Sequence, residues 1–273
     1  MQNTEQIVPS TKQWTESKEV RKARKRKEKA QAGMSVQPPM SDKNYVFCLK
    51  WGEKYSAEYV NKLHSMVQRN LTIEHEFVCY TENSKGINSN ITTCALPKKN
   101  LSGWWFKPWF LSNDLGVSGT GLFLDLDLIV FRNIDKLFTY EQDSNFTIIR
   151  DFNRIHRRSW EKMNSSVFKF KIGKFDPLYR EFDQNSFNQS KRYPGDQDWM
   201  YANIKKFTFW PDEWIQSYKW EMRGRKYLGI VDGKRNFVQP GEPVVPKETS
   251  IAVFHGQPNM HDCNDEWPRR HWY

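Results

Sequence analysis

The chain has 273 residues and a formal net charge of +10, and 15% of its residues are aromatic. This length fits one large α/β domain plus a tail, with ample core. No stretch reaches the roughly 18 apolar residues of a membrane span, and no segment near the N-terminus has the apolar form of a secretory signal. The four cysteines form no CxxC pair, so we expect reduced thiols and a cytoplasmic protein.

Positive charge is concentrated near the N-terminus. Residues 1–40 contain nine Lys and Arg and four Glu, and most of the basic residues fall within 18–29. Such a run is typical of a solvated, disordered arm. The alternative is an electrostatic tether to nucleic acid or to an anionic membrane, which would make the protein peripheral. Because 33–40 has the composition of a linker, we expect an arm and linker over 1–40 and a folded domain over 44–273.

The first half of this domain alternates between strand and helix patterns. Apolar periodicity predicts a helix over 56–69, and Pro108 suits the first turn of a second helix over 105–113. Strands are expected over 45–49, 76–80 and 91–96. This order is typical of a doubly wound, mostly parallel α/β sheet that is flanked by helices.

Two acidic residues, Asp125 and Asp127, lie inside the apolar run 122–131. We predict a buried strand there, on which both carboxylates would share one face. Because they would repel each other and are costly to desolvate, a divalent cation that also binds substrate phosphates would relieve both costs. The alternative is a strand end that emerges into solvent. Ligands of such sheets bind beyond the carboxyl ends of the strands, so Tyr55 and Thr81 should lie near the same edge.

The second half is less regular. Strands are expected over 146–150, 167–170 and 251–254, and a short helix is expected over 197–203. His255 and Gly256 directly follow the last of these strands. The sequence contains no internal repeat and no glycine-rich phosphate loop of either common type.

Five short motifs follow one another along the domain, each at an expected strand or helix end. They are Trp105-Phe106-Lys107, Asp125-Leu126-Asp127, Asn164-Ser165-Ser166, Asp196-Gln197-Asp198 and His255-Gly256. In this order they resemble the GT-A glycosyltransferases, above all the family-8-like galactosyl- and glucosyltransferases and related bacterial and phage enzymes. The resemblance covers most of 44–262. It implies a GT-A, Rossmann-like sheet and a nucleotide-sugar donor (a UDP-sugar). The cytoplasm expected from the cysteines would be that of a cell or of a phage-infected host.

The resemblance also implies a bound metal ion. Asp125, Asp127 and His255 match the residues that bind Mn²⁺ or Mg²⁺ in these enzymes, where the metal grips the diphosphate of the donor. Imidazole suits Mn²⁺ better than Mg²⁺, and Gly256 would let the backbone approach a phosphate closely. A lone histidine at a strand end is otherwise a packed or surface residue, and the position of His255 directly after a core strand is what favours the metal.

Other residues match donor-binding positions. Lys107 matches a basic residue over the donor phosphate or sugar, for which an exposed helix lysine is the alternative. Asn164 matches an asparagine near the donor sugar. The nucleotide base is expected near Trp51 or Tyr55, with Thr81 at the end of the second strand.

One departure from the family concerns the last motif. The family pattern continues from His-x-Gly to a Lys-Pro-Trp that contacts the diphosphate, whereas this chain reads His255-Gly256-Gln257-Pro258. Lys219 is our candidate for the missing cation, and a surface lysine is the alternative.

Asp196 and Gln197 match the Asp-Gln pair that lies below the transferring sugar, and we expect them to be the catalytic residues. They also suit a helix N-terminus, where acids interact favourably with the helix dipole. The match favours retention of the anomeric configuration. An inverting reaction would need a carboxylate base, for which Asp151, Asp196 and Asp198 are candidates.

The acceptor is expected to be a hydroxyl group of a glycan. The alternative is a hydroxylated base of DNA, as in phage DNA modification, because the basic arm and the aromatic, basic segment 267–273 could together bind phosphates and stack on bases. A duplex target would then have to be flipped out of its stack.

Two alternative interpretations assign the chain to other functional classes. The sequence Leu124-Asp125-Leu126-Asp127 also resembles the first motif of haloacid-dehalogenase phosphatases, in which the first Asp is a nucleophile. That motif usually lies near the start of a domain and continues differently. A non-catalytic nucleic-acid-binding protein is the other alternative, and it leaves the acidic pair unexplained.

Overall fold

The computed structural model of the chain describes residues 43–97, 101–224, 227–231, 234–237 and 243–273. The arm and linker expected over 1–40, with the basic run 18–29, lie outside the described residues. No helix in the described part of the chain has the length and apolar character to cross a bilayer.

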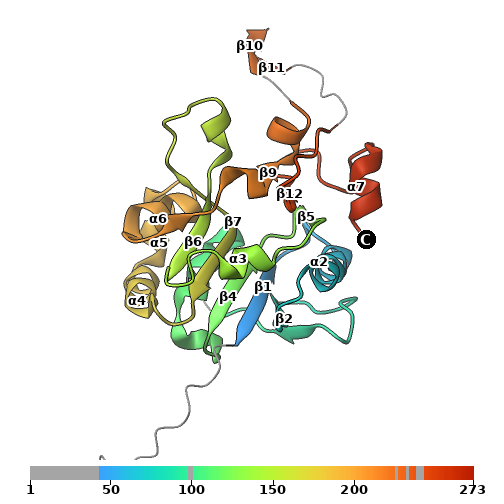
Figure 1. Ribbon diagram of the computed structural model, residues 1–273. Helices are drawn as coiled ribbons and strands as arrows, with labels where there is room; N and C mark the ends of the chain where they lie inside the picture. The colour runs from blue at the N-terminus through green and yellow to red at the C-terminus, as the bar shows by residue number, and fades with distance from the viewer. Residues whose placement is uncertain (1–42, 98–100, 225–226, 232–233, 238–242) are drawn as a thin grey trace, which may run out of the picture. The chain divides into compact units, whose positions relative to one another are not determined.

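A central sheet of seven strands organises the domain (Figure 1). The strands are β1 (Asn44–Lys50), β2 (Glu76–Thr81), β3 (Thr92–Cys94), β4 (Thr120–Leu124), β6 (Phe146–Arg150), β7 (Met163–Lys171) and β8 (Thr208–Phe209). Their spatial order is β3-β2-β1-β4-β7-β6-β8. The first four are parallel to one another, β7 is antiparallel to β4 and to β6, and β8 is parallel to β6. The predicted mostly parallel α/β sheet is therefore confirmed.

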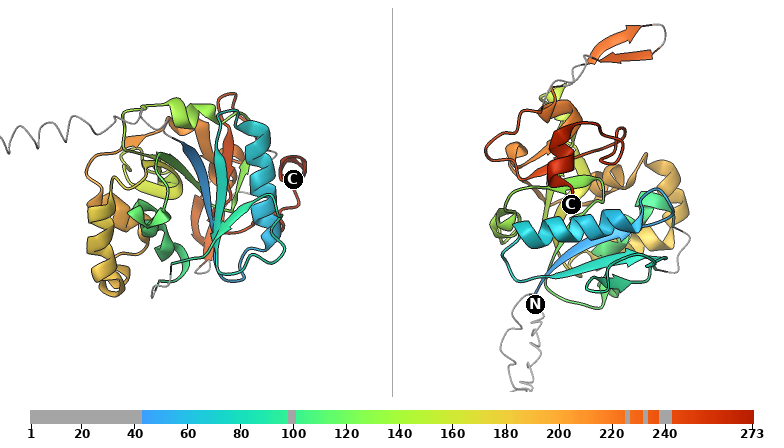
Figure 2. Two further views of the ribbon diagram at one scale, coloured as in Figure 1. Left: turned by 90° about the horizontal axis from the view of Figure 1, so that it is seen from below. Right: turned by 90° about the vertical axis from the view of Figure 1, so that its right-hand side faces the viewer.

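Helices cover both faces of this sheet (Figure 2). Helix α2 (Ala57–Asn70) covers one face, because Val60, Leu63 and Val67 recur three or four residues apart and are buried. Helices α4 (Asp176–Gln184), α5 (Ser186–Arg192) and α6 (Asp196–Asn203) lie on the other side. On that side, aromatic side chains of α4 and α6 pack in one core with those of β1, β4 and β7.

A second sheet of three strands adjoins the first. It consists of β5 (Leu128–Val130), β12 (Ile251–Val253) and β9 (Ile215–Ser217), with β12 in the middle. The prediction of one strand over 122–131 is therefore wrong, because β4 ends at Leu124 and β5 begins at Leu128 in a different sheet. Asp125 and Asp127 lie in the connection between the two sheets. An apolar run cannot distinguish one buried strand from two consecutive buried strands, which explains the error.

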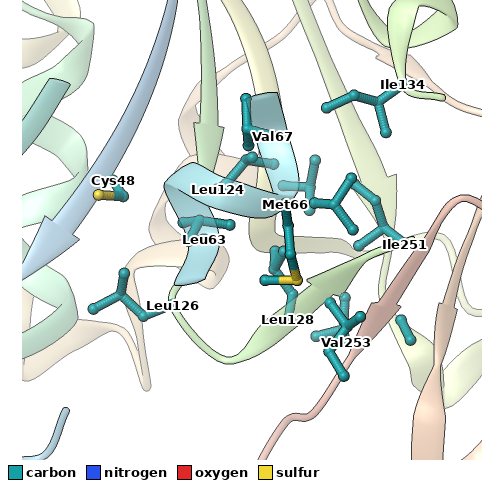
Figure 3. Packing of buried hydrophobic residues seen from close by; sticks show 14 of the residues in the cluster. Cys48, Leu63, Met66, Val67, Leu124, Leu126, Leu128, Ile134, Ile251 and Val253 are labelled. Atoms are coloured by element: carbon teal, nitrogen blue, oxygen red, sulfur yellow. The ribbon is translucent and has the colours of Figure 1, made fainter. Parts of the chain in front are cut away.

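The core between α2 and the two sheets fixes the path of this connection. Figure 3 shows side chains of α2 (Leu63, Met66, Val67), of 124–128 (Leu124, Leu126, Leu128) and of β12 (Ile251, Val253) in this core. Leu126 is buried with them at 3% exposure. Leu126, which lies between Asp125 and Asp127, thus anchors the connection from β4 to β5 in the core.

The helix predicted over 105–113 is a 3₁₀ helix, η1 (Gly103–Leu111). Pro108 lies inside it and removes a backbone donor, and 105–111 are all buried. The remaining elements are η2 (Asn113–Leu115), α3 (Asp135–Thr139), η3 (Phe152–Ile155), η4 (Asp212–Trp214), the π-helical turn η5 (Tyr218–Met222), β10 (Tyr227–Val231), β11 (Lys234–Phe237) and α7 (Glu266–His271).

Candidate active site

Two adjoining cavities lie at the carboxyl ends of β1 and β4. The smaller, about 140 Å³, is lined by Leu49, Trp51, Lys54, Tyr55, Trp104, Lys107, Asp125, Leu126 and Asp127. The larger, about 310 Å³, is lined by Trp104, Lys107, Asp125, Asn164, Ser165, Ser166, Pro194, Gly195, Asp196, Gln197, Asp198 and His255. They share Trp104, Lys107 and Asp125. Most of the residues singled out in the sequence therefore meet at one edge of the central sheet.

Lys107 joins the two cavities. Its ammonium group comes from the buried helix η1 and lies 2.8 Å from Oδ2 of Asp125, 3.1 Å from the carbonyl oxygen of Ser165 and 3.3 Å from the Ser165 hydroxyl. Burial lowers the pKa of Lys107, but the charges of Asp125 and Asp196 outweigh burial and hold the pKa above its usual value. A permanent positive charge is therefore fixed where the cavities meet.

Asp127 is less well neutralised. Its Oδ2 accepts a hydrogen bond of 3.0 Å from the hydroxyl of Tyr55. Burial, followed by the charge of Asp125, raises the pKa of Asp127 to about 6, although Lys107 and Tyr55 oppose this. The edge thus carries more acidic than basic groups, and an added cation would relieve the repulsion.

Asp196 begins α6 and is 5% exposed. Its Oδ2 has no hydrogen-bond partner among the residues that the structure describes. Burial raises the pKa of Asp196, and the charge of Lys107 opposes this shift. Gln197 donates from Nε2 to Oδ2 of Asp151 at 3.5 Å, and Asp198 lies 3.3 Å from the ammonium of Lys162. The predicted helix over 197–203 is confirmed, and its start delivers all three polar side chains to the larger cavity.

Asn164 lies within β7, which is longer than the predicted strand 167–170. The register between β6 and β7 shifts at Ile148 and Ile149, and such irregularities re-aim side chains. The Asn164 Oδ1 accepts a hydrogen bond of 3.0 Å from the backbone nitrogen of Ser166. A strand residue thereby reaches the larger cavity.

His255 follows β12 as predicted and lines the larger cavity with Asp125. Its ring stacks on Phe152 at 5.1 Å, and its Nε2 lies 2.6 Å from the hydroxyl of Ser217. Lys219 is 4% exposed and donates to the carbonyl oxygens of His255 and Gln257. The ammonium of Lys219 therefore lies at the segment where the sequence lacks the family lysine, although it lines neither cavity.

The predicted metal ligands are not assembled into one cluster. Within the described ranges, no three His, Cys, Asp or Glu side chains are close enough together to hold a metal ion. Asp125 and Asp127 come from the same connection, whereas His255 is held by Phe152 and Ser217. Their oxygen and nitrogen donors suit Mn²⁺, and the excess of negative charge suits any divalent cation. The assignment of these three ligands stays a prediction.

The predicted site residue Thr81 lies outside both cavities, and Trp104, which lines both, was not predicted. Thr81 ends β2, but its hydroxyl pairs with the turn at Asn83 (3.1 Å), and it lines neither cavity. Trp104 is 51% exposed and lines both cavities. The sequence signal for it was the aromatic run before Lys107. Gly256 has a φ of +68°, and a Cβ there would lie 3.3 Å from the Lys219 ammonium.

The two tryptophans of 267–273 do not form the exposed aromatic surface on which the DNA alternative depends. Trp267 stacks on Tyr218 at 5.5 Å and packs edge-on against Phe131. Trp272 is 8% exposed and contacts Tyr59 of α2. Both indoles are used for packing, because they cover apolar edges of the second sheet and of α2. Among the aromatic residues of this segment, only Tyr273 is largely exposed.

The chain is similar in fold, but not in sequence, to solved glycosyltransferases. No protein-family model matches the chain, and no curated protein matches it in sequence. A solved galactosyltransferase, LgtC, in complex with donor and acceptor sugar analogues superposes with a TM-score of 0.54 at 15% identity, over 83% of this chain and 93% of LgtC. An active-site mutant of LgtC gives 0.53 at 14% identity over the same shares. The glycosyltransferase GlyE of Streptococcus pneumoniae TIGR4 gives 0.48 at 13% identity, over 63% of this chain and 46% of GlyE.

The likeness to LgtC extends over 83% of this chain and 93% of LgtC. The chain has the fold of the GT-A glycosyltransferases.

Proposed function

We propose that the chain is a metal-dependent glycosyltransferase, which moves a sugar from a nucleotide-diphosphate sugar, a UDP-sugar, to a hydroxyl group of a glycan. The observation that carries the proposal is the convergence of Lys107, Asp125, Asp127 and Asp196 at two adjoining cavities of a GT-A fold. One cavity has aromatic walls that suit a base, and the other has polar walls that suit a sugar.

The acidic pair fits a divalent cation. Asp125 and Asp127 supply hard oxygen donors. Burial and the charge of Asp125 raise the pKa of Asp127, so an added cation would stabilise its ionised form. Mn²⁺ or Mg²⁺ held by this pair, with His255 as the third ligand, would supply a Lewis acid for the departing diphosphate.

The chain's own residues would stabilise the charges that develop on the leaving group and on the sugar. The ammonium of Lys107 faces the site where charge grows on the leaving group, and it is already oriented by Asp125 and Ser165. Asp196 and Gln197 present oxygen atoms that stabilise a positively charged anomeric carbon. Because these residues match the Asp-Gln pair of the family, we propose transfer with retention.

The other donor contacts follow the two cavities. Tyr55 beside Trp51 suits the nucleotide base, and Asn164 suits the donor sugar. Lys219 and Gly256 lie together next to His255 and suit the diphosphate. Thr81 remains a candidate for binding the nucleotide only because it ends β2, which lies beside β1.

A glycan acceptor is favoured over DNA. The DNA alternative relied in part on exposed aromatic residues near the C-terminus, and Trp267 and Trp272 are packed into the domain. We propose that the protein acts in the cytoplasm, where nucleotide sugars are made. The basic arm would then serve as a tether to a polyanion, and a salt-dependent gel shift that disappears when 1–40 are removed would favour DNA.

The test measures nucleotide release by the full chain from a panel of nucleotide sugars. We expect release with Mn²⁺, less with Mg²⁺ and none with EDTA. Asp127→Asn should lose the activity, whereas Asp143→Asn, at an exposed position outside both cavities, should retain it. Release that is indifferent to EDTA would contradict metal dependence, and no release from any donor would contradict the proposed function.

A further inference from the structure

We propose that Asp151 is a positioning residue, which holds the side-chain amide of Gln197 with its carbonyl oxygen toward the larger cavity. The inference rests on the proposed function, in which Gln197 lies beside the transferring sugar. Asp151 itself lines neither cavity, so it acts through Gln197.

Asp151 is anchored firmly. It follows β6 directly and is 7% exposed. Its Oδ1 accepts three hydrogen bonds, from the indole nitrogen of Trp160 at 2.8 Å, from the backbone nitrogen of Asn153 at 3.0 Å and from Nδ2 of Asn153 at 2.6 Å. Three hydrogen bonds to one oxygen fix the plane of the carboxylate. The second oxygen is left to face α6.

This second oxygen selects one end of the Gln197 amide. Oδ2 of Asp151 lies 3.5 Å from Nε2 of Gln197. An ionised carboxylate can only accept hydrogen bonds, whereas an amide has one donating and one accepting end. The nitrogen must therefore face Asp151. Since Gln197 lines the larger cavity, its carbonyl oxygen is the end that it offers to a ligand there.

The orientation matters for the chemistry. When the diphosphate departs, positive charge develops at the anomeric carbon, and a fixed carbonyl dipole with its oxygen toward that carbon stabilises it. A reversed amide would present N–H donors and destabilise the same charge. Without Asp151, either end of the amide could turn toward the cavity.

The test is a double-mutant cycle of Asp151→Asn and Gln197→Glu in the full chain. In Asp151→Asn, the new amide can donate to Gln197, whose oxygen then turns away from the cavity. In Gln197→Glu, two carboxylates face each other. In the double variant an amide again faces a carboxylate, with the polarity reversed, and an oxygen again faces the cavity. Asp143→Asn, an exposed acid outside the site, is the matched control.

The first readout is thermal unfolding without ligand. At pH 8, Gln197→Glu should lower Tm by about 2–4 °C in the chain that retains Asp151, and by less than about 1 °C in the chain that already carries Asp151→Asn. Strictly additive shifts would overturn the positioning role. This readout is independent of enzymatic activity.

The second readout is nucleotide release from UDP-galactose or UDP-glucose with Mn²⁺. Asp151→Asn should lower kcat roughly ten- to hundredfold while KM for the donor stays the same, because the orientation of one group is lost. The double variant should turn over faster than Asp151→Asn alone, whereas losses that simply multiply would overturn the proposal. If the wild-type chain releases no nucleotide from either donor, the proposed function fails there, and the unfolding cycle still decides the role of Asp151.

Discussion

The ammonium group of Lys107 lies 2.8 Å from Oδ2 of Asp125, although the two residues are 18 positions apart and come from different elements. Lys107 belongs to a 3₁₀ helix and Asp125 to the connection between two sheets. Their contact forms a wall that the smaller and the larger cavity share. Since Lys107 is 6% exposed, the pair is formed at the cost of desolvating a charge, which is typical of a functional site.

Replacement of Lys107 by Met should impair both function and stability. Asp125 would then face Asp127 and Asp196 without a buried counter-charge, so the free energy of unfolding should fall by about 1–3 kcal/mol. Nucleotide release should fall by at least a hundredfold, since a charge-stabilising donor is typically worth about 10²–10³ in kcat. Urea denaturation and a release assay measure the two effects. Lys206→Met, at an exposed position, is the control, and equal losses in both variants would contradict a specific role for Lys107.

Added Mn²⁺ should stabilise the protein through the acidic pair. Ligand binding to the folded state raises the free energy of unfolding by about 2.7 kcal/mol at a hundredfold excess over Kd, which corresponds to a Tm increase of roughly 5–10 °C for a domain of this size. Differential scanning fluorimetry with and without EDTA measures the shift. Asp127→Asn should abolish most of it, and an undiminished shift in this variant would place the metal elsewhere.

Arg154 and Glu221 form a buried ion pair, and the Arg154 guanidinium lies over Phe152, the ring on which His255 stacks. Nη2 of Arg154 lies 3.0 and 3.1 Å from the two carboxylate oxygens, and the side chains are 6% and 13% exposed. Arg154→Met should cost about 3–5 kcal/mol, because it leaves a buried carboxylate unpaired. Arg154→Met with Glu221→Gln should recover part of this loss. Chemical denaturation of the two variants tests the expectation, and a double variant less stable than Arg154→Met would contradict it.

Asp135 should make stability depend on acidic pH. Burial raises its pKa, but hydrogen bonds from the side chain and backbone of Thr72 outweigh this, so that the folded-state pKa lies below the ordinary 3.8. A carboxyl group with a depressed folded-state pKa contributes stability above about pH 4, and the contribution is lost as the pH falls through the folded-state value.

Asp135→Asn should therefore cost about 1 kcal/mol at pH 7, and the difference from wild type should shrink below about pH 4. Unfolding by urea at pH 7, 5 and 3 measures this. Thr139→Ala on the same helix α3 leaves the carboxylate in place and should show no such pH dependence. A constant difference for Asp135→Asn across the series would show that the Thr72 contact does not favour the ionised form.

Much of the central sheet could be predicted from the sequence, and the reason is local. The strands β1 and β2 are nearly continuous buried runs and the helix α2 has a helical apolar period, so the predicted bounds lie within two residues of the observed ones. The helix α6 was found because its acidic start is a local signal. By contrast, the helix predicted over 105–113 is the 3₁₀ helix η1 (Gly103–Leu111), and the sequence did not indicate its type because seven consecutive buried residues carry no period that distinguishes the two helix types.

The site was predictable by residue type and only partly by position. The motifs led to Lys107, Asp125, Asn164, Asp196 and His255, all of which line the larger cavity. The aromatic run before Lys107 was a signal for Trp104 but did not show that it forms a wall of both cavities, and no motif indicated Asp151 as a support for Gln197. Those roles depend on which surfaces meet after the chain has folded, and no short-range pattern records them.

The order of apolar runs and charged motifs along the chain was sufficient by itself to determine an α/β sheet with an acidic edge, because burial periodicity and turn chemistry are properties of neighbouring residues. Only the tertiary structure decided that β4 and β5 belong to different sheets, that Leu126 anchors their connection, and that Lys107 reaches Asp125. These depend on contacts between residues far apart in sequence, whose energies are set by packing and desolvation in three dimensions.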